Sequence, residues 1–237
     1  MSRDWAGRAR GGIVRGATAA ALVVAGLAGS GGRAAAASTW SIVQSRGVLT
    51  VANTALTVNF GSLPLTGDKI IVGFDLLKPS GLAVGDGNGV ALRRVASAGT
   101  AFVYEYDVPV TASRYIRITW SHSASISANG LDVRGLAAAD DGDGTPGTLT
   151  GSTSPTGSPT YASSAAGELL YSFSGNNARL VRATQPSGWT LDPNSVDDSG
   201  AVQASAAYTN SSGEAESSSW AYSPVNRTWS VITVAFK

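Results

Sequence analysis

The stretch Lys69–Leu77 has the sequence KIIVGFDLL, in which apolar residues occupy nearly every position. A strand that is apolar on both faces belongs in the middle of a sheet whose two faces are both covered. The stretch therefore predicts a central, buried strand around which the rest of the fold is arranged.

Other segments alternate between apolar and polar positions with a period of two residues. In Ala101–Asp107 (AFVYEYD) the aromatic side chains at 102, 104 and 106 share one face, whereas Val103 and Glu105 share the other. Such alternation is typical of strands in an antiparallel sandwich, which bury one face. Further predicted strands are Arg114–Ser121, Glu168–Ser174, Val202–Thr209 and Thr228–Phe236, with a shorter edge strand at Gly147–Gly151.

Turn-forming residues separate these segments, and helical periodicity is absent after the N-terminal region. The stretch Gly85–Gly89 (GDGNG) tolerates positive φ angles and predicts a tight hairpin. We therefore expect an all-β protein, built as an antiparallel two-sheet β-sandwich.

The first 37 residues have the composition of a helical signal peptide. Arginines come first, then the apolar run Ala17–Ala28, and then small residues at Ala35–Ala37 ahead of Ser38. That order predicts export, with cleavage near Ala37-Ser38. The apolar run is shorter than the ~20 residues that a membrane span needs. We thus expect a secreted, extracellular protein with no membrane association after cleavage.

Removal of residues 1–37 changes the charge. The full chain has 17 basic and 16 acidic residues, and the leader takes five Arg and one Asp, which leaves 12 and 15, a net charge of −3. A mildly acidic chain gives no electrostatic reason to expect nucleic acid as a partner. The absence of cysteine excludes a disulfide framework and thiolate metal sites.

Residues 38–237 are enough for a single sandwich domain, with a Gly/Ser/Thr/Pro-rich loop at 137–160. The alternative is two small β units at 38–136 and 161–237, with that segment as their linker. A weak internal echo with an offset of 100 residues fits both arrangements, since Gly67-Asp68 corresponds to Gly167-Glu168.

Short motifs follow one another along nearly the whole mature chain. They are Gly67-Asp68, the Asp86–Gly89 turn, the aromatic strand Phe102–Tyr106, Arg134–Leu136, Gly167–Leu170, Gly188–Thr190 and the terminal Trp229–Lys237. This series resembles the concanavalin A-like jelly-roll modules of bacterial secreted proteins and of phage tail or other virion-associated proteins. The resemblance implies a two-sheet sandwich that recognises glycans or proteins outside the cell. It implies no catalytic residue, because the paired acidic strand motif of the glucanase members has no counterpart here.

No catalytic centre is predicted. The single histidine, His122, lies next to a predicted strand end, and no Gly-x-Ser-x-Gly turn accompanies it, so we expect a solvated loop residue. Glu105 and Asp107 share one strand face and could contact one sugar, and we expect that face to be wet.

Calcium is the one metal that the sequence leaves open. Asp140, Asp141 and Asp143 supply oxygen ligands in a glycine-rich segment, but the EF-hand pattern fails because Pro146 replaces its glycine and Ser152 its glutamate. A solvated acidic loop is the preferred interpretation, and no other cofactor is expected.

Exposed aromatic rings are the remaining candidates for ligand binding, because they can stack on a sugar or anchor a protein contact. Trp189 lies in a turn-like context, and Trp40 and Trp229 lie near the ends of predicted strands. Trp120 and Trp220 are predicted to be core residues. Burial is also the more common state for the first three.

Three functions therefore remain. The leading hypothesis is a secreted, non-enzymatic sandwich that binds glycan or protein at a cell or particle surface through its loops. The second is a structural protein, tail-associated or decorating a phage particle, and the third is a polysaccharide hydrolase or lyase that uses Glu105 and Asp107.

Overall fold

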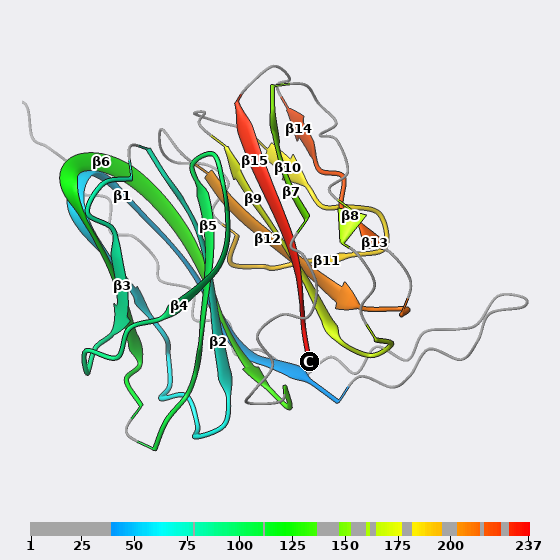
Figure 1. Ribbon diagram of the computed structural model, residues 1–237, viewed down its shortest axis with the longest axis horizontal. Coiled ribbons are helices and arrows are strands. Elements are labelled where there is room, and N and C mark those ends of the chain that lie inside the picture. The colour runs from blue at the N-terminus through cyan, green and yellow to red at the C-terminus, as the bar shows by residue number, and fades with distance from the viewer. Residues whose placement is uncertain are drawn as a thin grey trace, which may run out of the picture.

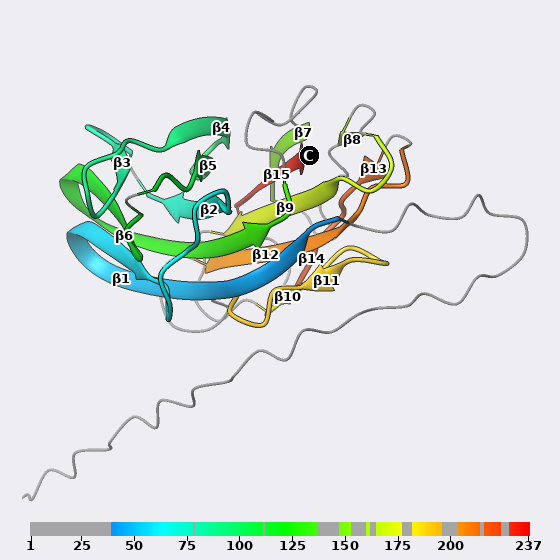
Figure 2. The ribbon, with the colours of Figure 1, turned by 90° about the horizontal axis from the view of Figure 1, so that it is seen from below.

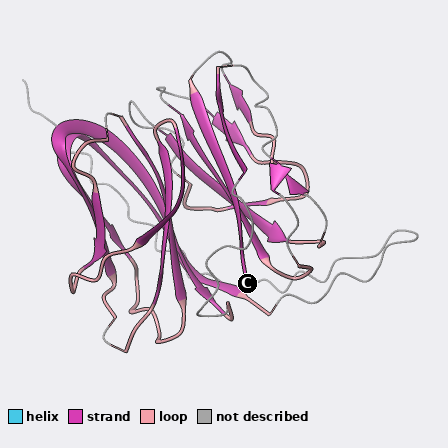
Figure 3. Ribbon diagram, viewed as in Figure 1, coloured by secondary structure: helices cyan, strands magenta, loops and turns pink. Residues whose placement is uncertain are grey.

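The computed structural model describes residues 39–77, 79–110, 112–136, 147–152, 160–161, 165–176, 182–195, 203–213, 216–223 and 228–237. All regular elements in these ranges are β-strands, and their sheets are antiparallel (Figure 3). The all-β prediction is confirmed. Within the same ranges, no helix is long and apolar enough to cross a membrane.

The first half of the chain forms a six-stranded sheet with the order β1-β6-β2-β5-β4, in which β3 also pairs with β6. Its strands are β1 (Ser41–Asn59), β2 (Lys69–Leu76), β3 (Ala83–Asp86), β4 (Arg93–Ala98), β5 (Ala101–Asp107) and β6 (Tyr115–Arg134).

The second half forms a five-stranded sheet with the order β11-β12-β9-β15-β7 and two small ribbons, β10 with β14 and β8 with β13. The large sheet contains β7 (Gly147–Gly151), β9 (Leu169–Asn176), β11 (Thr190–Leu191), β12 (Gln203–Asn210) and β15 (Trp229–Phe236). The ribbons contain β8 (Thr160–Tyr161), β10 (Arg182–Thr184), β13 (Glu216–Ser217) and β14 (Ala221–Ser223).

The two long strands of the first sheet bend together and fold that sheet over on itself (Figure 2). Beyond the bend, the end of β1 and the start of β6 form an outer layer with β3. The first core lies inside the fold, and Leu56, Ile118 and Val84 of the outer layer contribute to it, as do Val72 of β2 and Tyr104 of β5. The outer layer thus adds a third layer of β-structure beside the two large sheets.

The second core lies between the two large sheets, which face each other in Figure 1. Ile71, Val103 and Leu131 come from the first sheet, and Phe173 and Ile232 come from the second. Since β2 contributes alternate side chains to both cores, all eight of its residues are buried. The prediction of a central strand at 69–77 is therefore confirmed.

The outer face of the second sheet is also covered. A third core on that side contains Leu170, Val231, Trp189, Trp220 and Trp229. The Trp220 ring is fully buried, and its Nε1 donates a hydrogen bond to Ser172 Oγ at 2.9 Å. Burial of Trp120 and Trp220 confirms their prediction as core residues.

Two glycines lie where the sheets pack tightly against each other. A Cβ placed on Gly73 of β2 would lie 2.2 Å from Phe173 Cδ2 and 2.5 Å from Tyr171 Oη, both on β9. A Cβ on Gly175 would lie 2.9 Å from the Asp75 side chain. Any larger residue at these positions would push the sheets apart. The distance between the sheets therefore depends on glycine at positions 73 and 175.

The two halves have the same strand order. Numbered along each half, the five main strands are β1, β2, β4, β5 and β6 in the first and β7, β9, β11, β12 and β15 in the second, and both sheets have the order 1-5-2-4-3. Consecutive strands of one half therefore stay in one sheet. The echo at an offset of 100 residues thus corresponds to a repeated topology.

The turn before the second strand of each half repeats in detail. Gly67 has φ 86° and Gly167 has φ 91°, a region that favours glycine. The amide of Gly67 donates to the Val108 carbonyl and the amide of Gly167 donates to the Ser211 carbonyl, at 3.0 and 2.9 Å. Each glycine is followed by an acidic residue that pairs with a basic residue at the end of its half. Asp68 pairs with Arg134, the last residue of β6, and Glu168 pairs with Lys237, just after β15.

An ionisable side chain is buried between the sheets. Asp75 is fully buried on β2, opposite Ser127 of β6, and burial raises its pKa to about 7 against a smaller lowering effect of a hydrogen bond with Thr100. The folded protein therefore binds a proton here that the unfolded chain releases near pH 4.

The bend in β1 contains a strained residue. Ala52 has φ 51°, in the left-handed region, and lies within the register shift between Thr50 and Asn53, which a second shift between Asn53 and Ala55 follows. This conformation costs a residue with a Cβ ~1–2 kcal/mol.

Ala52→Gly should raise the free energy of unfolding by about 1 kcal/mol in urea denaturation, because the relieved strain exceeds the added entropy of the unfolded chain. Ala55→Gly, in the extended part of the same strand, should lower it, and equal effects of the two would contradict the strain.

The buried carboxyl predicts a pH-dependent stability. Because its pKa is higher in the folded state, its contribution is most favourable below about pH 4 and is lost as the pH rises through 7. Asp75→Asn removes this loss, so it should stabilise the protein at pH 8 by about 3 kcal/mol more than at pH 5. Urea midpoints at both pH values measure the difference, and a gain that is the same at both would show that Asp75 does not titrate in this range.

Candidate functional site

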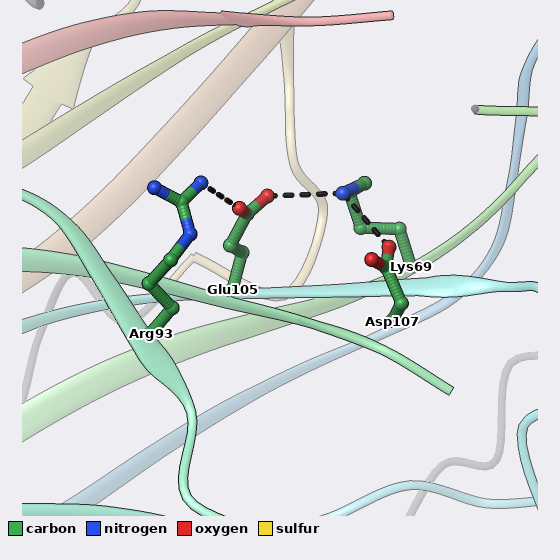
Figure 4. A network of polar contacts seen from close by, with 4 residues as sticks. All are labelled: Lys69, Arg93, Glu105 and Asp107. Carbon is green, nitrogen blue, oxygen red and sulfur yellow. Dashed lines mark hydrogen bonds and ion pairs between the residues drawn. The ribbon is translucent and has the colours of Figure 1, made fainter. Parts of the chain in front are cut away.

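The two carboxylates predicted to share a strand face lie in a network of four charged residues (Figure 4). Lys69 Nζ lies 3.1 Å from Glu105 Oε2 and 2.9 Å from Asp107 Oδ1. Glu105 Oε1 contacts the Arg93 guanidinium. Two cations and two anions therefore neutralise one another at the end of β5.

Strand register places these side chains together. Lys69 lies opposite Asp107 across the β2–β5 pair, and Arg93 lies opposite Glu105 across the β4–β5 pair. Opposite residues in an antiparallel pair have Cβ atoms ~5 Å apart on the same face, within reach of an ion pair. The alternation of AFVYEYD predicts the shared face of Glu105 and Asp107, but the two cations come from other strands.

Burial differs sharply between the two carboxylates. The side chain of Glu105 is 3% exposed and that of Asp107 is 42% exposed. The expectation of a wet face is therefore wrong for Glu105, because this face of β5 packs toward the second sheet, where Val103 joins the second core. An exposed acid and a sequestered one do not form the open pair that flanks a glycosidic bond.

A shallow depression of about 290 Å³ adjoins the network. Arg93, Glu105 and Asp107 line it together with Ala91 and Tyr106. Burial, with Asp86 nearby, raises the pKa of the Tyr106 phenol to about 12, and its hydroxyl lies 3.5 Å from Asp86 Oδ2. At neutral pH the lining thus offers an exposed guanidinium, a half-exposed carboxylate and a neutral phenol, which suits weak polar contacts.

The three tryptophans predicted as ligand platforms pack against the protein. Trp189 is 8% exposed and Trp229 is 3% exposed, both in the third core. Trp40 is partly buried, and its Nε1 donates to the Gly167 carbonyl at 3.1 Å. A ring in such a position has little free face on which a sugar could stack. The placement of these three tryptophans therefore does not support a role in ligand binding.

The remaining candidates do not add a site. His122 is exposed, but it lies at the bend inside β6 rather than in a loop, because that strand continues to Arg134. Asp140, Asp141 and Asp143, like residues 1–37, fall outside the described residues. Among the residues that the structure does describe, no group of three His, Cys, Asp or Glu side chains could hold a metal ion.

Exposed apolar residues lie in the connections at one end of the first sheet. These connections are at the bottom of its strands in Figure 1. We call this surface the loop end, and it consists of residues 60–68, 86–91, 108–110 and 112–115. Its exposed members are Leu63 (57%), Leu65 (56%), Val90 (42%), Val110 (85%) and Tyr115 (37%). Outside the loop end, Val51 and Leu149 are also exposed.

Backbone hydrogen bonds join these connections into one surface. The Gly67 amide donates to the Val108 carbonyl at 3.0 Å, and the Gly87 amide donates to the Tyr115 carbonyl at 2.8 Å. The Phe60 amide donates to the Arg114 carbonyl at 2.9 Å. Exposed apolar side chains on neighbouring loops mark interaction sites more often than side chains scattered over the surface do.

The arrangement defines an all-β protein with stacked antiparallel sheets, an ion network whose inner carboxylate is sequestered, and an apolar loop end. No family model matches the chain, and no curated protein or solved structure is significantly similar to it.

The network predicts unequal effects for its two carboxylates. Glu105→Gln removes the negative charge that pairs with the buried Lys69 ammonium at 3.1 Å, so we expect a loss of about 3 kcal/mol in the free energy of unfolding. Asp107→Asn removes a half-exposed partner and should cost ~1 kcal/mol or less. Urea denaturation measures both, and equal losses would contradict the difference in burial as the cause.

Proposed function

We propose that this protein is a secreted, non-enzymatic β-sandwich module that binds glycan or protein at a cell or particle surface. The proposal includes the two-sheet sandwich itself, formed by the sheets that enclose the second core. The concanavalin A-like, jelly-roll character stays a prediction from the motif series.

The apolar loop end is the observation that carries the proposal. Its connections rest on a rigid scaffold, since β2 and β5 are buried almost throughout. Loops held by such a scaffold are the usual place for recognition in sandwich proteins. Leaving Leu63, Leu65 and Val110 in water has no folding benefit, whereas a partner would remove their surface from solvent.

The ion network supports a non-enzymatic role. A general acid or base needs a carboxyl that can reach the reacting atom. Glu105 is 3% exposed on its side chain, and its two oxygens contact Lys69 and Arg93. Asp107 alone is accessible, and hydrolysis of a glycosidic bond uses a pair.

Removal of the apolar side chains tests the proposal. Leu63→Ser combined with Leu65→Ser should reduce binding at least about tenfold, because each side chain loses buried apolar contact worth more than 1 kcal/mol. Binding is measured on a glycan array and by pull-down from envelope fractions.

Val51→Ser is the matched control, because Val51 is 56% exposed but lies at the bend of β1. Its binding should equal that of the wild type. Silence of the wild type in both assays, or equal binding by the double variant, would refute the proposed role of the loop end.

A further inference from the structure

The described residues between 39 and 136 separate their charges by burial. Five of the six acidic side chains are buried, and Asp107 is the exception. The six arginines of the same residues are all exposed: Arg46, Arg93, Arg94, Arg114, Arg117 and Arg134. The surface of this half is therefore cationic, although the mature chain as a whole was expected to carry −3.

Ion pairs occupy only some of these arginines. Arg93 contacts Glu105, and Arg134 contacts Asp68 at 2.9 Å. In the part of the chain that the structure describes, Arg114 and Arg117 have no carboxylate within ion-pair distance. An exposed guanidinium without such a partner is available to an anionic ligand.

Arg117 lies on the outer layer of the folded first sheet, on the side away from the first core. Since Ile116 and Ile118 point into that core, Tyr115, Arg117 and Thr119 of β6 point outward. We call this surface the outer face. Register places Thr57 of β1 on one side of Arg117 and Gly85 of β3 on the other, while Asn59 lies beside Tyr115.

Tyr115 connects the outer face to the loop end. The Arg114 guanidinium lies 4.9 Å from the centre of the Tyr115 ring and donates a hydrogen bond to its hydroxyl at 2.6 Å. The ring is therefore held in place by the same cation that faces solvent beside it. Gly85 adds no side chain next to Arg117, but a Cβ there would lie 3.1 Å from the Val90 carbonyl oxygen, so the backbone at Val90 borders this side of the outer face.

We propose that the outer face binds an acidic polysaccharide, a chain of sugars that carries carboxylates. This inference rests on the proposed function and names the ligand class for the outer face, which adjoins the loop end at Tyr115. Arg114 and Arg117 pair with the carboxylates, because a guanidinium donates two parallel hydrogen bonds to such a group. Thr57 and Asn59 supply exposed hydroxyl and amide groups for the sugar hydroxyls, and Tyr115 supplies an apolar ring.

The same chemistry argues against nucleic acid. Single strands bind to successive aromatic platforms along a positive groove. Among the described residues between 39 and 136, Tyr115 is the one exposed aromatic side chain, and it lies on the outer face of a sheet.

The experiment uses polygalacturonate as the acidic probe and its methyl-esterified form as a neutral probe of the same backbone. Isothermal titration at low and high salt measures the affinity of the whole protein for both. We expect the acidic polymer to bind at least about tenfold more tightly and its affinity to fall as salt rises. Arg117→Gln and Arg114→Gln should each weaken this binding about tenfold.

Arg94→Gln is the matched control, since Arg94 is an exposed arginine on β4, outside the outer face. It should bind like the wild type, and urea denaturation of all three variants verifies their folding. Equal affinity for the two polymers, or unchanged binding by Arg117→Gln, would overturn the inference. Tighter binding of an oligothymidylate than of polygalacturonate would overturn it in favour of nucleic acid.

The outcomes separate this inference from the function on which it rests. If neutral glycans or a protein bind through Leu63 and Leu65 while polygalacturonate does not bind, the acidic ligand is wrong and the recognition role stands. If the Leu63→Ser/Leu65→Ser variant binds every partner as the wild type does, the loop end is wrong, whatever the result at Arg117.

Discussion

The contact between β2 and β9 is the constraint on which the rest of the structure depends. Gly73 has no side chain, and the rings of Phe173 and Tyr171 occupy the space that one would fill. The two sheets can approach closely because of this, and both faces of β2 become buried. Once β2 is enclosed, polar groups such as Asp75 and Glu105 are carried into the interior, where burial or ion pairing determines their state.

The sequence predicts the individual strands well, because their side-chain pattern is local. Ala101–Asp107 and Gly147–Gly151 have the bounds that alternation and turn residues indicate. The continuation of β6 from Ser121 to Arg134 could not be predicted in this way, because its small polar residues resemble a loop. From Ala124 to Val133 this part of the strand is buried, and small side chains pack there for reasons that only the tertiary structure shows.

The candidate site is predictable only in part for a similar reason. The shared face of Glu105 and Asp107 follows from their spacing, but the burial of Glu105 depends on a second sheet from more than 40 residues further along the chain. Trp189 and Trp229 are predicted ligand platforms because they are large aromatic residues near turns or strand ends. In the structure they pack in the third core, which covers the outer face of the second sheet. The surface that remains consists of ordinary residues, such as Leu63 and Arg117, whose exposure no local pattern distinguishes from that of any other loop or strand residue.

The two large sheets face each other across the second core. On its other side, the first sheet is covered by the outer layer across the first core, and the second sheet is covered by the residues of the third core. Residues that meet solvent on the outer face, such as Tyr115 and Arg117, are therefore separated from the shared interior by a complete layer of side chains. Substitutions there would change the chemistry of this surface at little cost in folding. A lineage could exchange one partner for another through a few such changes, while the interior residues continued to specify the same architecture.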